Sequence, residues 1–343
     1  MENILLLAAS CLFAICAILS FIPVYSGHGR TFIRLTWLLS TVIVVYDVGR
    51  MVSFLLLSRF EYKYVYSHSD CETELIYKIS ALWSGQEGSF LLWALILSIM
   101  GFFMLQVQGK GARRAFGLYT SIVSCILFMC FIIDPFAKAS LISADGLGLN
   151  EALKDPWMIV HPPLVFISYS AMALLFSLSA TLSGNTSKDV TDRILFWLRI
   201  SWFFLGAGIL SGSIWAYRAL GWGGYWAWDP IENAALVPWL MICAYLHARE
   251  YRKPSVCIVP FSIACFGVFL ARSGVLKDQS VHAYADGNIT VTGIISFIIL
   301  GAVLFLYFSR FRKLDAKRII NSFSMYDQRL ITYSLYGYAA LIF

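Results

Sequence analysis

The stretch from Trp215 to Trp239 reads WAYRALGWGGYWAWDPIENAALVPW and holds five of the chain's eleven tryptophans. Three glycines lie among the rings, and because they have no Cβ they let backbone or a planar ligand come close. Indole rings also gather at the boundary between lipid and water, so an aromatic belt is the alternative interpretation. The density of rings, together with Asp229 fixed before Pro230, favours a platform for a large flat ligand.

The composition around this stretch is that of a chain whose solvent is mostly lipid, since 59% of the 343 residues are apolar and 13% are charged. We expect a single membrane-embedded domain over 1–343, an all-α polytopic helix bundle of about nine to ten spans. A tenth span from Ile331 ends after ITYSLYGYAALIF, which suggests either the front part of a longer protein or a partner chain that supplies the rest. Runs long enough to cross a hydrocarbon core of ~30 Å lie at 4–24, 36–58, 89–108, 116–133, 162–183, 195–216, 234–250, 257–271 and 291–309.

Basic residues are distributed unevenly between the loops, and they collect on the cytoplasmic face of membrane proteins. Alternate loops, beginning with the one near Tyr25, hold 16 of the 26 Lys and Arg residues. This predicts that the N-terminus and the tryptophan segment both lie outside. We attribute the net charge of +6 to the basic cytoplasmic loops and expect no nucleic-acid partner. The outer loops carry most of the acids, among them Asp155, and we expect these acids to be solvated.

Two patterns inside the spans predict helix contacts. Asp47 and Arg50 are three residues apart and therefore share a helix face. A charge at this depth pairs or lines a cavity, so we favour an internal ion pair over the polar path of a transporter, for which the sequence shows no inverted repeats. Gly208 and Gly212 form a GxxxG pattern, which lets a neighbouring helix approach closely.

Three histidines are candidate ligands. His161 precedes Pro162, and because proline disfavours helix in the residue before it we expect a helix to begin just after His161. His282 lies in the outer loop that leads to the ninth run. A lone loop histidine is usually solvated, but two on either side of an aromatic plate are a common way to hold heme iron. His247 lies about twelve residues, or ~18 Å, into the seventh run, where it either binds a ligand or reaches for water.

The tryptophan segment also resembles a known family. WGGYWAWDPIENAALVPW is similar to the tryptophan-rich WWD signature of the heme-handling proteins of cytochrome c biogenesis. LWSGQEGSFLLW from Leu82, VHPPLVFISYSA from Val160 and RSGVLKDQSVHAYA from Arg272 narrow the likeness to heme lyases of the CcmF/NrfE type, over nearly the whole chain.

The resemblance implies roles for individual positions. His161 and His282 match the paired ligands of an external heme, and His247 matches a ligand of a separate b-type heme inside the membrane, whose second ligand in the family lies beyond residue 343. Arg218 and Arg272, expected at the outer face, are candidates to pair with the heme propionates, or are simply solvated. The segment that would hold the porphyrin comprises Trp222, Gly223, Gly224, Tyr225, Trp226, Trp228 and Asp229.

The resemblance further implies a cytochrome c heme lyase, although no residue is assigned as catalytic. Such proteins add the two thiols of a CxxCH segment of apocytochrome c to the vinyl groups of heme. The implied setting is the bacterial inner membrane with the heme site facing the periplasm. The implied partners are heme, apocytochrome c, a heme chaperone, other maturation subunits, membrane lipid and a chain that completes the C-terminal part. The alternatives are a heme-binding scaffold without catalysis and a transporter.

Overall fold

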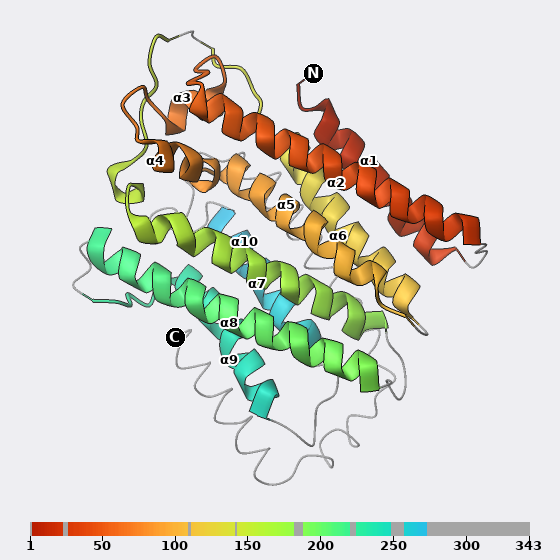
Figure 1. Cartoon of the computed structure of the whole chain (residues 1–343). Coiled ribbons are helices and arrows are strands. Elements are labelled where there is room, and N and C mark those ends of the chain that lie inside the picture. The colour runs from red at the N-terminus through yellow and green to blue at the C-terminus, as the bar shows by residue number, and fades with distance from the viewer. Residues whose placement is uncertain are drawn as a thin grey trace.

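The computed structural model describes residues 2–22, 27–108, 111–140, 143–181, 188–219, 224–247 and 257–272. These residues form a bundle of long helices that run side by side (Figure 1). Apart from one isolated antiparallel bridge between Tyr62 and Lys138, the regular structure of the described residues is helical. The prediction of an all-α bundle is therefore confirmed.

The long helices follow the expected apolar runs. Among the described residues, six helices are long and apolar enough to cross a membrane, and they correspond to the first six runs. The seventh and eighth runs form α9 (Pro230–His247) and the 15-residue α10 (Ile258–Arg272), while the runs near 291 and 331 lie outside the described residues. The six are α1 (Ile4–Phe21), α2 (Gly27–Leu56), α5 (Gln86–Leu105), α6 (Ala112–Ile133), α7 (Pro156–Thr181) and α8 (Lys188–Ala219).

The long loops that follow α2 and α6, which the charge pattern assigned to the same side of the membrane, lie together. One holds α3 (Lys63–His68), α4 (Leu75–Ser80) and the 3-10 turn η1 (Ala81–Trp83), and the other holds the 3-10 turn η2 (Glu151–Leu153). The backbone N–H of Lys63 donates to Ala137 at 2.8 Å, and that of Leu147 donates to Tyr66 at 2.7 Å. The side of the membrane that these loops face stays a prediction.

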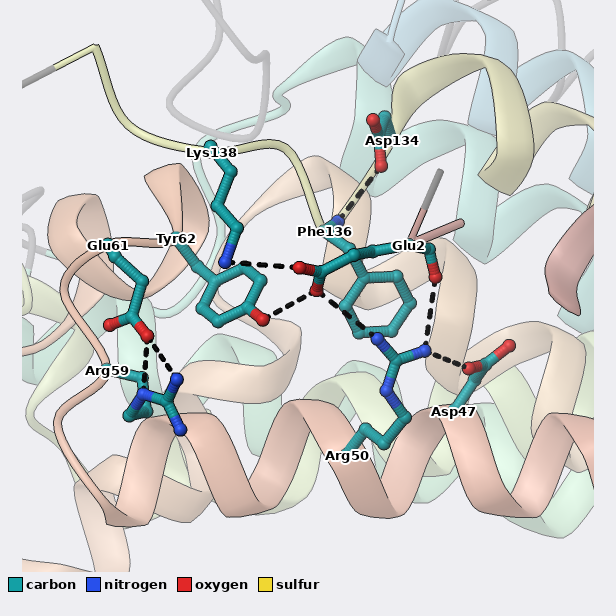
Figure 2. Close-up of polar contacts among 9 residues, drawn as sticks. All are labelled: Glu2, Asp47, Arg50, Arg59, Glu61, Tyr62, Asp134, Phe136 and Lys138. Atoms are coloured by element: carbon teal, nitrogen blue, oxygen red, sulfur yellow. Dashed lines mark hydrogen bonds and ion pairs between the residues drawn. The ribbon is translucent and has the colours of Figure 1, made fainter. Parts of the chain in front are cut away.

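The ion pair predicted in the second span is confirmed. Arg50 donates to the buried Asp47 carboxylate at 2.8 Å and also reaches Glu2 at 3.5 Å. Figure 2 shows that Glu2 in turn contacts Tyr62 and Lys138. Burial alone would raise the pKa of Glu2, but the hydrogen bond from Tyr62 and the contact with Lys138 outweigh it and lower the pKa. The cluster fastens the start of the chain to α2 and to both loops.

The helix that carries the GxxxG pattern packs closely against a neighbouring helix, as predicted. Helices α7 and α8 lie side by side (Figure 1) and are antiparallel, since later residues of one meet earlier residues of the other. A Cβ built on Gly208 would lie 2.8 Å from Cγ2 of Val165, so only glycine allows this approach. Further along, Ser168 Oγ donates to the Ser201 carbonyl at 2.8 Å, a polar contact that suits helices packed in lipid.

The expected start of the fifth helix was wrong. Helix α7 begins at Pro156, so that both Pro162 and Pro163 lie inside it and His161 is in its second turn. Proline inside a helix removes the N–H that would bond the carbonyl four residues earlier. For Pro162 that carbonyl belongs to Met158, and it accepts the indole N–H of Trp83 at 3.3 Å instead. A distant donor therefore lets the helix extend through the prolines.

Candidate functional site

The beginning of α7 and the end of α8 are joined through one carboxylate. Asp155 precedes α7, and its Oδ1 accepts the backbone N–H of Trp157 at 2.8 Å, which caps the helix. Its Oδ2 accepts Nε of Arg218, in the last turn of α8, at 2.9 Å. The negative charge at one helix start and the positive charge at the other helix end complement both helix dipoles. The expectation that Asp155 is solvated was wrong, since it is buried.

The two tryptophans that flank the aromatic stretch have packing roles. Trp215 lies in α8, and its indole donates to the Ala152 carbonyl at 2.7 Å, which holds the preceding loop against this helix. Trp239 lies in α9, where it stacks on Trp202 with ring centroids 5.9 Å apart and donates to the Trp202 carbonyl at 3.0 Å. Helix α8 includes residues up to Ala219 and α9 begins at Pro230, so both helices extend into the loop of 215–239 that the sequence suggested.

Just before α9, large aromatic rings are exposed. Tyr225 stacks on Tyr217 of α8 with centroids 4.5 Å apart and planes 19° from parallel. Trp226 and Trp228 meet edge to face at 6.3 Å. Tyr225 is 59% exposed and Trp228 is 58% exposed, and a Cβ on Gly224 would meet nothing within 4 Å. We call residues 224–229 the aromatic segment, and it offers ring faces with open space beside them.

Asp229 has a structural reason for its position at the end of the aromatic segment. Its Oδ1 accepts the N–H of Ile231 at 2.7 Å, so it caps α9, and Pro230 occupies the first helical position, which proline tolerates. Trp228, just before Asp229, has a φ of 60°, which lies in the left-handed region that residues other than glycine rarely adopt. The turn thereby keeps the Trp228 ring exposed where α9 begins.

The imidazole of His161 is held by α8. Its Nδ1 lies 2.7 Å from the Gly208 carbonyl oxygen, and a Cβ on Gly212 would lie 2.7 Å from its Cε1. Gly212 is about 10 Å of helix before Ala219, where α8 ends. The sequence placed His161 just before the start of a helix, but the structure places it inside α7 and against α8, about two turns from the end of α8 that leads to the aromatic segment.

Arg272 ends α10 and is buried, which excludes the alternative that this side chain is simply solvated. Its guanidinium carbon lies 4.7 Å from the ring centroid of Phe90 in α5, and this cation–π contact contributes to holding a charge away from water. Phe90 is near the start of α5, which follows Trp83 closely. Arg272 therefore lies at the end of the bundle where α7 begins.

His247 lies at the opposite end of α9 from Asp229. It is the last of the 18 residues of this helix, about 25 Å from the first, which is farther than the ~18 Å that the sequence suggested because α9 begins earlier. The ring is exposed, and its Nδ1 donates to the Cys243 carbonyl at 2.8 Å. Trp222, Gly223 and His282 lie outside the described residues.

Two residues with clear roles at this site were missed in the sequence. Trp83 belongs to the quoted LWSGQEGSFLLW motif, but its partner, the Met158 carbonyl, is 75 positions away. Asp155 looked like one more loop acid. The available signals were the proline pair, which requires an outside donor for a carbonyl, and the Asp-Pro dipeptide at 155–156, which is typical of a helix start.

The fold and site together define a polytopic helical membrane protein that exposes an aromatic segment at one end of its bundle, near a histidine held between two helices. The model of a family described as "Cytochrome C assembly protein" matches residues 83–276. The chain belongs to this family, whose match covers α5 to α10, with the α7–α8 pair and the aromatic segment among them.

Individual relatives agree with this assignment. The chain is 33% identical over 304 residues to the cytochrome c-type biogenesis protein ccl1 of Rhodobacter capsulatus, covering 83% of this chain and 46% of the relative. It is 33% identical over 299 residues to NrfE of Haemophilus influenzae, covering 81% and 47%, and 32% identical over 311 residues to CcmF of Escherichia coli, covering 85% and 48%. The chain thus spans about half the length of the curated relatives it matches. With the six apolar helices, they support a multi-pass inner-membrane protein.

A solved structure shows the same fold. The cytochrome c heme lyase CcmF superposes with a TM-score of 0.67 over 99% of this chain and 59% of that chain, at 22% sequence identity. The arrangement of the helices in Figure 1 is therefore that of a known membrane bundle.

Proposed function

We propose that this chain binds heme as a substrate at the aromatic segment and promotes its covalent attachment to apocytochrome c. The observation that carries the proposal is the placement of two exposed rings, Tyr225 and Trp228, on the segment that leaves α8, the helix that also holds His161. Flat apolar faces suit a porphyrin, and an imidazole suits its iron. The names of the relatives, which refer to cytochrome c biogenesis and heme lyase, point to the same chemistry.

One further observation supports a heme at this segment. Within the described part of the chain, the indole Nε1 of Trp226 is buried and has no hydrogen-bond partner, and a buried donor of this kind calls for a partner such as a ligand.

The roles proposed for the residues rest on their contacts and, for His282, on the family resemblance. His161 would ligate the iron through Nε2, since Nδ1 donates to the Gly208 carbonyl, and His282 would supply the second ligand. The aromatic segment would hold the ring. Arg218, whose side chain is 54% exposed beside Asp155, and Arg272 would neutralise the propionates. The internal heme at His247 stays a prediction.

In the proposed reaction each thiol of the apocytochrome adds across a vinyl double bond of heme. A carbon–sulfur bond forms, the thiol proton ends on the neighbouring vinyl carbon, and no net oxidation occurs. The chain would orient heme and cap its iron until the histidine of the client replaces one ligand. We place this site on the periplasmic side, and the apocytochrome, a heme chaperone, the other maturation subunits and a chain that supplies the C-terminal part are the proposed partners.

The test is His161→Ala, with His28→Ala as the matched control because His28 is exposed at the start of α2. Each purified variant is titrated with heme and followed by absorption, and each is expressed with its maturation partners to measure holocytochrome c. We expect His161→Ala to lose the spectrum of histidine-ligated heme and most holocytochrome, while His28→Ala retains both. Unchanged heme affinity and unchanged cytochrome yield in His161→Ala would refute the proposal.

A further inference from the structure

The contact between α7 and α8 has a register that fits an imidazole. On α7, His161 and Val165 are four residues apart and share a face, and on α8 Gly208 and Gly212 do the same. Val165 enters the space beside Gly208, and His161 enters the space beside Gly212. A Cβ on Gly212 would lie 2.7 Å from Cε1 and 2.8 Å from Nδ1 of His161. No side chain larger than that of glycine fits there while the ring stays in place.

The hydrogen bond at this contact determines which ring nitrogen carries the proton. The Gly208 carbonyl oxygen can only accept, so Nδ1 of His161, at 2.7 Å, must be the donor. In a neutral imidazole the proton on Nδ1 makes Nε2 the nitrogen with a lone pair. Ser211 also donates to the same carbonyl at 2.9 Å, and a carbonyl oxygen has lone pairs for both donors.

The turn of α7 that carries this ring is held from a second direction. The Met158 carbonyl, one turn before Pro162, accepts the indole N–H of Trp83 at 3.3 Å. At the start of the helix, Asp155 caps Trp157. His161 therefore sits on a helical turn fixed at its backbone by η1 and its own cap, with its side chain fixed by α8.

From these contacts we propose that Gly212 is a positioning residue, which with the Gly208 carbonyl keeps His161 as the Nδ1–H tautomer and makes Nε2 its iron-binding atom. The inference rests on the proposed function and deepens it. Donation of the second ring N–H to a carbonyl orients a ligating histidine and strengthens it as a ligand, and loss of such a partner typically lowers metal affinity about 10–100-fold. The GxxxG pattern here serves a ligand as well as helix packing.

The test compares Gly212→Ala with Gly206→Ala. A Cβ on Gly206 would meet Nε1 of Trp239 at 2.7 Å, so the control introduces an equally close contact on the same helix, away from His161. The first measurement is an NMR spectrum of heme-free protein with ¹⁵N-labelled histidine, which reports which ring nitrogen carries the proton. Because the chain has five histidines, the signals that are missing in His161→Gln identify those of His161. The second measurement is heme affinity by absorption.

We expect the unmodified protein and Gly206→Ala to show His161 protonated at Nδ1, and Gly212→Ala to show a mixture of tautomers. We expect heme affinity to fall at least about tenfold in Gly212→Ala and to stay within about threefold in Gly206→Ala. The inference is overturned if Gly212→Ala keeps both the Nδ1–H tautomer and its heme affinity, or if both variants lose affinity equally.

Two results separate this inference from the proposed function. If His161→Ala binds heme as tightly as the unmodified protein, the proposed function fails, whatever the tautomer. If His161→Ala loses heme but the unmodified protein carries its His161 proton on Nε2, the positioning role alone fails. That spectrum needs no variant at Gly212 to fold.

Discussion

Substitutions of Asp155 should lower the local stability of the start of α7 by amounts that follow from the two contacts of its carboxylate. Asp155→Ala removes the helix cap from Trp157, which costs about 1 kcal/mol. It also removes the pair with Arg218, and a half-exposed ion pair of this kind contributes about 0.5 kcal/mol. Asp155→Asn keeps an oxygen that accepts the N–H of Trp157 and loses only the charge. The expected losses in local stability are therefore about 1.5 kcal/mol for the alanine variant and about 0.5 kcal/mol for the asparagine variant.

Hydrogen–deuterium exchange at the first turns of α7 measures this difference directly, because local opening determines the exchange rate. At about 1.4 kcal/mol for each tenfold change, Asp155→Ala should exchange about tenfold faster at the amides of Trp157 and Met158. Asp155→Asn should exchange about twofold faster. The start of α6 after Gly111 provides an internal control that neither variant should change.

The reasoning is refuted if the alanine and asparagine variants exchange at the same rate, since the cap would then contribute nothing beyond the charge. It is also refuted if Arg218→Gln accelerates exchange as much as Asp155→Ala. Either result would mean that the Oδ1 contact at 2.8 Å does not stabilise the helix start.

Two other contacts lead to predictions on stability. Trp83→Phe leaves the Met158 carbonyl without its indole donor and should lower the free energy of unfolding by about 1–3 kcal/mol, measured as a lower thermal midpoint in detergent. The control is Trp37→Phe, which removes a buried N–H with no partner among the described residues. Equal losses of stability in the two variants would contradict the role given to Trp83. Burial lowers the pKa of His68, stacked on Tyr64 at 4.3 Å, below the usual 6.5. The unfolded chain therefore binds the proton first, so stability should fall as pH decreases below about 6.5. His68→Gln should show a smaller loss between pH 7.5 and 5.5, and an unchanged pH dependence would exclude this histidine as the cause.

Several features of the bundle follow from the sequence because they depend on local periodicity. The length of the apolar runs predicted the first six spans, since about twenty residues of helix are needed to cross the hydrocarbon core. The spacing of three between Asp47 and Arg50 predicted their pairing, and the spacing of four between Gly208 and Gly212 predicted a close helix contact. Each of these patterns repeats with the helix turn and can be recognised without knowledge of the neighbour.

The ends of the helices were harder to predict because they depend on donors elsewhere in the chain. His161 was expected before a helix, on the rule that proline disfavours helix in the residue before it. The structure continues α7 through the prolines, since Trp83 supplies the hydrogen bond that Pro162 cannot. The same limit affected Asp155, whose buried carboxylate pairs with Arg218, 63 positions further along.

The sequence by itself thus determined a lipid-embedded helical bundle, the pairing inside its second helix and the chemical character of its aromatic segment. Only the tertiary structure decided that His161 rests against Gly212 and donates to the Gly208 carbonyl. The physical reason is that an imidazole has two ring nitrogens, and the sequence does not determine which of them carries the proton. The choice between them is made by the acceptor that packing brings within 2.7 Å, and that acceptor lies 47 residues away on another helix.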